Sequence, residues 1–316
     1  MIVAAIGPDQ RRPATAVARL AEQGEIGGIV VLGRVPQPGR AIEICQVASR
    51  ATNQLPLLVS MDAEPGLAAS RMGIKTSLSD QSASSLKSID QVKASARNIG
   101  DHLHQLGVHH NYAPVCDLAA NVAIRSRSFG STQSEVEPRM LAFLEETQAM
   151  GLVATAKHFP GHGTVKGDSH KKLVFLDAMP PELPIFKDAI EAGVLSVMVG
   201  HIEMRTQNVY NTQGRPASLS PEIIQDLLKK TLNFKGIVIT DALDMGALSQ
   251  FPDADLLAAK AGSDIILMPA DPGKLIGQIQ TEIQRDPTFA RQIEASIKKV
   301  LRLKICAGLF VSKPMT

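Results

Sequence analysis

Eight short runs of apolar, largely β-branched residues recur along the chain, and each precedes a longer segment whose apolar residues have helical spacing. The runs do not alternate with polar residues, which is typical of strands covered on both faces in a parallel sheet. A repeat of this kind, with a period of about 40 residues, predicts a (β/α)8 barrel of the TIM type. The predicted strands are 2–6, 27–32, 56–61, 108–115, 153–159, 196–202, 236–240 and 264–268.

Residues 1–316 are predicted to form a single α/β domain, because no low-complexity linker interrupts the repeat. An open doubly wound sheet is the alternative architecture. A glycine-rich dinucleotide or phosphate loop would support that alternative, but Gly161-His162-Gly163 lacks the rest of such a fingerprint.

The charges nearly balance, since 33 Lys and Arg against 31 Asp and Glu give a net charge of +2. Neither nucleic acid nor an acidic membrane surface is therefore expected as the main partner. No apolar run approaches the roughly 20 residues of a membrane span.

The three cysteines are widely spaced, unlike a disulfide framework or a clustered metal site. No signal-peptide pattern follows Met1, so a cytoplasmic location is expected, while the oligomeric state stays open.

Polar residues gather at the C-terminal ends of the predicted strands, where the active site of a barrel lies. The strand starts carry no comparable set. The residues at the C-terminal ends are Asp62, Glu64, Asn111, Asp117, Lys157, His158, His201 and Asp241.

The segment 157–170 is the richest in polar residues, and its three glycines would let a loop fold over a ligand. It contains Lys157, His158, Asp168 and His170. Asp168 lies two positions before His170 and can orient the imidazole for proton transfer. The alternative interpretation is a solvated surface loop in which the histidines occur by chance.

Asp241 ends an almost purely apolar strand, where it could be a nucleophile, a general base, a metal ligand or a helix N-cap, a role that Asp244 could also fill. A divalent ion held by Asp241 and His158, His162 or His170 is a competing interpretation. The sequence lacks HExxH and two-His-one-carboxylate signatures, so neither a metal nor another cofactor is expected. It also lacks the GxSxG elbow of a serine nucleophile.

The stretch KHFPGHG at 157–163 with DSH at 168–170 resembles the signature of glycoside hydrolase family 3, particularly its bacterial β-N-acetylglucosaminidases, or β-hexosaminidases. Further similar blocks follow in the family's order between about residues 27 and 310. These blocks are NYAPVCD at 111–117, RSFG at 127–130, EAG at 191–193, PASLS at 216–220, FKG at 234–236 and DAL at 241–243.

The resemblance implies an enzyme that removes terminal β-linked N-acetylglucosamine with retention of configuration. Asp241 would be the nucleophile, and His170, oriented by Asp168, would be the general acid and base. The residues implied to hold sugar hydroxyls or the N-acetyl group are Asp62, Arg71, Arg127, Lys157 and His158. A pocket closed at its far end would give exo action, and peptidoglycan fragments are the implied substrates.

The chain departs from the family pattern at two places. Asp62-Ala63-Glu64-Pro65-Gly66-Leu67 replaces the usual Asp-Gln-Glu-Gly-Gly-Arg, which shifts Arg71 relative to the family's arginine, and Thr164-Val165 replaces Asp-Thr. Four alternatives stay open: a family 3 β-glycosidase of other specificity, a phosphorylase, a non-catalytic sugar-binding barrel, and a metal-dependent barrel lyase or aldolase.

Overall fold

The computed structural model describes residues 1–7, 12–33, 35, 37–67 and 81–310, and within them eight parallel strands form one sheet. The strands follow one another in chain order, β1 pairs with β10, and the parallel bridge between Ile239 and Ile265 brings the last two strands together. The predicted barrel is therefore confirmed, and the doubly wound alternative is wrong. The strands are β1 (Ile2–Ile6), β2 (Gly28–Val31), β3 (Leu58–Met61), β4 (His110–Asn111), β5 (Val153–Phe159), β7 (Ser196–Val199), β9 (Ile237–Thr240) and β10 (Ile266–Leu267).

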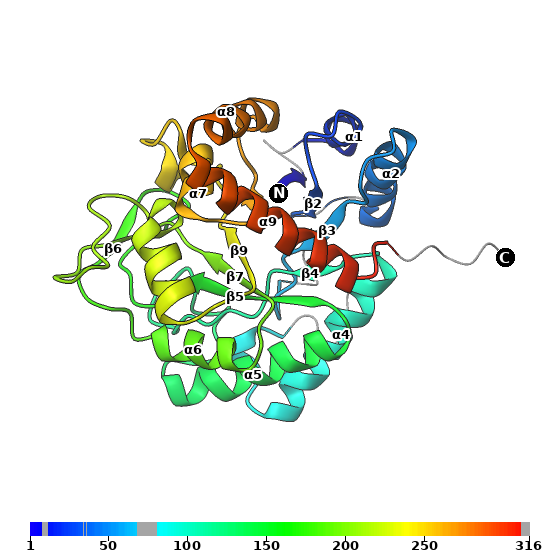
Figure 1. Ribbon diagram of the computed structural model, residues 1–316. Coiled ribbons are helices and arrows are strands. Elements are labelled where there is room, and N and C mark those ends of the chain that lie inside the picture. Colours follow the sequence, from blue (N-terminus) through cyan, green and yellow to red (C-terminus); the bar gives the residue numbers. More distant parts are fainter. Residues whose placement is uncertain (8–11, 34, 36, 68–80, 311–316) are drawn as a thin grey trace.

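Helices surround the sheet, as Figure 1 shows. Their ends carry the expected signals: Ser88 and Gln91 form a capping box at the start of α4, and Gly193, with φ of 80°, follows the end of α6. The main helices of the described residues are α1 (Ala14–Glu22), α2 (Pro38–Ala51), α4 (Ile89–Gln105), α5 (Gln133–Ala149), α6 (Leu183–Glu191), the π-helix η3 (Glu222–Thr231), α7 (Ala254–Ala261), α8 (Pro272–Arg285) and α9 (Pro287–Cys306).

Each strand buries both faces, which explains the unbroken apolar runs. In β1, Ile2, Ala4 and Ile6 belong to the core between the strands and the helices, whereas Val3 and Ala5 belong to the core inside the barrel.

Helix α9 closes the barrel at the end where the strands begin. Ser296 donates to Asp264 at 2.6 Å, while Lys299 and Lys304 donate to the backbone carbonyls of Gly236 and Pro56. In Figure 1, α9 accordingly crosses in front of the strands. The pocket that the polar residues line lies at the opposite end, where the strands finish.

Two short strands, β6 (Val174–Leu176) and β8 (Ile202–Met204), pair in parallel beyond the ends of β5 and β7. The predicted strand 196–202 is thus divided, because β7 ends at Val199 and β8 begins at Ile202. This second sheet was not predicted, and it fixes the exit of the loop that follows β5.

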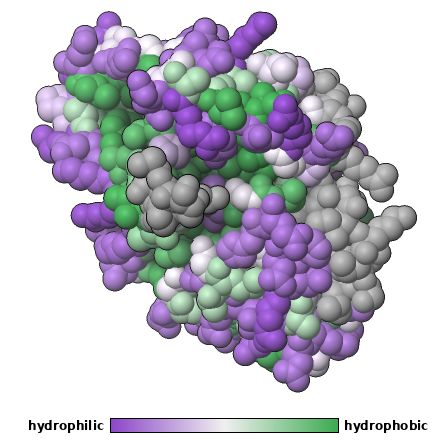
Figure 2. Space-filling view, turned by 90° about the vertical axis from the view of Figure 1, so that its right-hand side faces the viewer, coloured by the Kyte–Doolittle hydropathy of each residue, from purple (hydrophilic) through white to green (hydrophobic). Residues whose placement is uncertain are grey.

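Figure 2 shows the side of the molecule that carries α2 and the C-terminal end of α9. Apolar residues form a band across this face, and hydrophilic side chains surround them. Among the exposed apolar side chains of the structure are Val47 of α2, Leu55, which lies between α2 and β3, and Ile305 of α9. In the part of the chain that the structure describes, no helix is both long enough and apolar enough to cross a membrane.

Candidate active site

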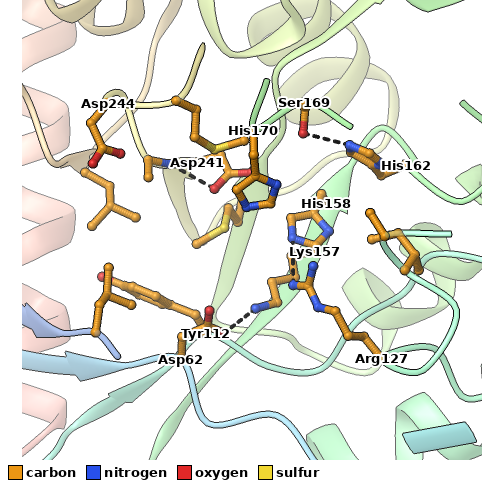
Figure 3. Close-up of a pocket in the computed structure, with 17 residues that line it drawn as sticks. Asp62, Tyr112, Arg127, Lys157, His158, His162, Ser169, His170, Asp241 and Asp244 are labelled. Atoms are coloured by element: carbon orange, nitrogen blue, oxygen red, sulfur yellow. Dashed lines mark hydrogen bonds and ion pairs between the residues drawn. The ribbon is translucent and has the colours of Figure 1, made fainter. Parts of the chain in front are cut away.

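The C-terminal ends of the strands surround a pocket of about 280 Å³ (Figure 3). This volume is near the lower end of the range for small-ligand sites and suits a single sugar ring. Its polar lining residues come from four different strand ends and the loops that follow them. They are Asp62, Tyr112, Arg127, Lys157, His158, His162, Ser169, His170, Asp241 and Asp244.

Asp241 follows β9, and its backbone N–H donates to the carbonyl of Val199 in β7 at 2.9 Å. Its Oδ1 accepts a hydrogen bond from the N–H of Ala242 at 2.8 Å. Burial disfavours the ionised carboxylate, but the imidazoles of His158 and His201 and the Ala242 N–H outweigh burial, and they hold the pKa of Asp241 below its usual value. Asp241 is therefore ionised at neutral pH, which its expected role as the nucleophile requires.

His170 reaches the pocket from the loop after β5 and lies close to Asp241 in Figure 3. Its Nδ1 lies 2.8 Å from Oδ1 of Asp168, and the same oxygen accepts the His170 backbone N–H at 3.0 Å. These two contacts orient the ring, so that Nε2 is the nitrogen available to a substrate. The expected pairing of Asp168 with His170 is present in the structure.

Side chains and backbone on both sides hold this loop in place. Asn121 donates to the carbonyls of Val165 and Gly167, each at 2.9 Å, and His162 Nε2 lies 2.8 Å from Oγ of Ser169. Beyond Asp241, the N–H of Gly246 donates to the carbonyl of His170 at 3.0 Å. The segment that follows the carboxylate therefore binds directly to the segment that carries the imidazole.

Two cations and two carboxylates form a largely buried cluster at the base of the pocket. Lys157 Nζ lies 2.5 Å from Asp62 and also forms an ion pair with Glu64. Arg127 donates two hydrogen bonds to Glu64, at 2.7 and 2.8 Å. The carboxylates can accept hydrogen bonds from sugar hydroxyls, and the two cations can donate hydrogen bonds to them. Because the charges are already fixed in place, neither contact requires the site to reorganise.

We predict that Glu64→Gln lowers the free energy of unfolding by about 3–5 kcal/mol, because it leaves buried Lys157 and partly buried Arg127 without one of their counter-charges. Glu43→Gln is the matched control, since Glu43 pairs with Arg40 on the surface, where both side chains are more than half exposed. The control is expected to cost less than about 1 kcal/mol. Urea denaturation of both variants measures the difference, and equal losses would contradict the assigned role of Glu64.

Asp117 is completely buried behind the pocket and connects two histidines. Its Oδ2 lies 2.6 Å from Nδ1 of His158, and its Oδ1 accepts the backbone N–H of His162 at 2.7 Å. Burial favours the neutral acid, but the contacts with His158 and the His162 N–H keep the pKa of Asp117 below its usual value. Asp117 thus holds His158 in the pocket wall, within 3.3 Å of Arg127.

Glu182 supports the first turn of the loop after β5. Its Oε1 accepts the N–H groups of Leu118 and Gly163, at 3.4 and 3.1 Å, while Oε2 is buried without a hydrogen-bond partner. A Cβ at Gly161 would lie 2.5 Å from the Glu182 carboxylate, which explains the glycine there. Burial and the neighbouring Asp117 raise the pKa of Glu182 to about 7.

This raised pKa predicts a pH-dependent stability. Between pH 4.5 and about 7 the folded chain keeps a proton on Glu182 that the unfolded chain has lost, so the free energy of unfolding falls as the pH rises across this window. Glu182→Gln removes the titration and keeps an acceptor for Gly163. Relative to this variant, the wild type is expected to lose about 3 kcal/mol over the window, measured by urea denaturation at each pH. A pH-independent difference would contradict the prediction.

The structure brings together most of the residues expected at the site. Asp62, Arg127, Lys157, His158, His170 and Asp241 line one pocket. Arg71 lies outside the described residues. The sequence marked Glu64 and Asp117 as polar strand ends without assigning them a role, and it did not single out Glu182 or Asn121. Glu182 and Asn121 lie outside the predicted strand ends and outside the segment 157–170, so no pattern in the sequence marked them.

A parallel barrel with acidic and basic groups gathered at the C-terminal ends of its strands is the arrangement of barrel enzymes. The chain belongs to glycosyl hydrolase family 3, because residues 2–303 match the family described as "Glycosyl hydrolase family 3 N terminal domain".

Individual relatives agree with this assignment. The chain is 29% identical to beta-hexosaminidase A of Pseudoalteromonas piscicida, over 91% of this chain and 54% of that protein. It is 31% identical to a beta-hexosaminidase of Actinobacillus pleuropneumoniae, over 88% and 84% of the two chains. The crystal structure of a beta-N-acetylhexosaminidase from Beutenbergia cavernae superposes with a TM-score of 0.82 at 26% identity and covers 96% of both chains. The chain thus spans about half the length of the first relative and most of the other two.

Proposed function

We propose that the protein is a retaining, exo-acting β-N-acetylglucosaminidase. The observation that carries the proposal is the placement of an ionised carboxylate, Asp241, close to an imidazole oriented by Asp168, in a pocket with room for one sugar ring. The names of the relatives, which are hexosaminidases, support the choice of sugar.

In the first step, a carboxylate oxygen of Asp241 bonds to the anomeric carbon while the bond to the leaving oxygen breaks. His170 Nε2 gives its proton to that oxygen. In the second step, the same nitrogen takes a proton from water, whose oxygen bonds to the anomeric carbon and releases the Asp241 carboxylate. Two inversions give net retention.

The remaining groups position the sugar. Asp62 and Lys157 lie at the closed base of the pocket, where they can bind the hydroxyls of a terminal residue, and Arg127 and His158 form the adjacent wall. Because the apolar core of the barrel lies directly beneath, a polymer cannot pass through the pocket. This geometry supports removal of terminal sugars, with peptidoglycan fragments as the natural substrates that we propose.

Hydrolysis of p-nitrophenyl β-N-acetylglucosaminide tests the proposal, and NMR of the first-formed sugar shows whether the β-anomer is retained. Repeating the assay with phosphate distinguishes hydrolysis from phosphorolysis, in which the product would be a sugar phosphate. Binding of N-acetylglucosamine without turnover would instead indicate a non-catalytic barrel.

A further inference from the structure

His201 is a fully buried polar residue that takes no direct part in the proposed reaction. It follows β7, the strand next to β9, and both of its ring nitrogens have partners. Nδ1 lies 2.7 Å from Oγ of Ser218, which is also completely buried, and Nε2 lies 2.9 Å from the backbone carbonyl of Ala242. A carbonyl can only accept, so Nε2 carries a hydrogen and donates it.

Ala242 is the residue that holds the carboxylate of Asp241. Its N–H donates to Oδ1, the bond drawn as a dashed line beside Asp241 in Figure 3, and its carbonyl is the group that His201 binds. In the described part of the chain, Oδ2 of Asp241 accepts no hydrogen bond. The peptide N–H therefore occupies one oxygen and leaves the other for the sugar.

We propose that His201 is a positioning residue for the nucleophile: by fixing the carbonyl of Ala242, it sets the orientation of the Ala242 N–H and so directs the free oxygen of Asp241 at the anomeric carbon. This inference rests on the proposed function. A packing role alone does not require both ring nitrogens to be bonded, because an apolar side chain of similar volume would fill the same space. A carboxylate displaced by about 1 Å loses on the order of 10²-fold in rate.

Two conservative variants separate the two hydrogen bonds of His201. Glutamine places an amide N–H where Nε2 lies, and so keeps the bond to Ala242. Asparagine places its amide where Nδ1 lies, and so keeps only the contact with Ser218. We expect His201→Asn to lower kcat by roughly 10- to 100-fold with KM changed less than threefold, and His201→Gln to stay within about fivefold of the wild type.

The leaving group of the substrate distinguishes this defect from a defect in acid catalysis. A poorly placed nucleophile slows the p-nitrophenyl and 2,4-dinitrophenyl N-acetylglucosaminides by the same factor. Loss of the acid slows mainly the substrate with the poorer leaving group. His109→Leu is the control, since this imidazole accepts the Val59 N–H away from the pocket, and its loss is expected to leave kcat unchanged.

Crystal structures of the two His201 variants complete the test independently of turnover. We expect the Asp241 carboxylate to be rotated in His201→Asn and unmoved in His201→Gln. An unmoved carboxylate in His201→Asn, or equal kcat in both variants, would overturn the role of His201. A wild-type protein that cleaves neither substrate would overturn the proposed function instead, and the carboxylate position would still decide whether His201 holds Asp241.

Discussion

Asp241→Ala is expected to lower kcat/KM for p-nitrophenyl β-N-acetylglucosaminide by roughly 10⁴-fold or more, as removal of a covalent nucleophile does. In the proposed mechanism Asp241 is the ionised carboxylate held beside the proton donor in the pocket, and alanine offers nothing to bond with the anomeric carbon. The backbone bond from Asp241 to Val199 does not involve the side chain, so β9 is expected to fold normally.

Two measurements make this result specific. Asp226→Ala removes an exposed carboxylate from η3, outside the pocket, and is expected to leave the activity unchanged. Azide is small enough to enter the space left by Asp241→Ala, and its attack should give a glycosyl azide of inverted configuration. Retention of more than about a tenth of the wild-type rate by the folded Asp241→Ala protein would show that another group is the nucleophile.

The second large loss is expected for His170→Ala, at roughly 10²- to 10⁴-fold on the p-nitrophenyl substrate. The loss should be much smaller on the 2,4-dinitrophenyl substrate, because dinitrophenolate leaves without a proton. Asp168→Ala is expected to show the same pattern at lower amplitude, since Asp168 acts by orienting the ring through a 2.8 Å contact. Initial rates on the two substrates measure the ratio.

His104→Ala is the matched control for His170→Ala. His104 is also exposed, but it contacts the carbonyl of Met150 on α5's C-terminal side, outside the pocket, and its loss should not affect turnover. If His170→Ala slowed both substrates equally, the imidazole would serve the arrangement of the site rather than proton transfer.

The barrel was predictable because its strands are buried on both faces, and an unbroken apolar run as short as Ile237–Thr240 suits a buried strand better than a helix. The small sheet of β6 and β8 was not predictable in the same way. In β6, exposed Phe175 lies between buried Val174 and Leu176, and three residues are too few to establish an alternation.

The residues that line the pocket were also easier to predict than the contacts that support them. Strand ends revealed Asp241 and Lys157, and the spacing of Asp168 and His170 indicated an oriented imidazole. Which cations Glu64 would join could not be predicted, since Arg127 lies 63 residues further along the chain. Supporting contacts of this kind depend on how the loops pack, which periodicity does not encode.

The direct hydrogen bond between Gly246 and His170 has a practical consequence for redesign. A second bond, from the Ala247 N–H to the Ser169 carbonyl, joins the same two segments, and a Cβ at position 246 would lie 2.7 Å from the Lys171 carbonyl. The spacing between Asp241 and His170, the two groups proposed to react, is thus fixed by backbone that neither β5 nor β9 contains. Chimeras that exchange one of these segments with a relative will misalign the pair, so both have to be transplanted together as a single cassette.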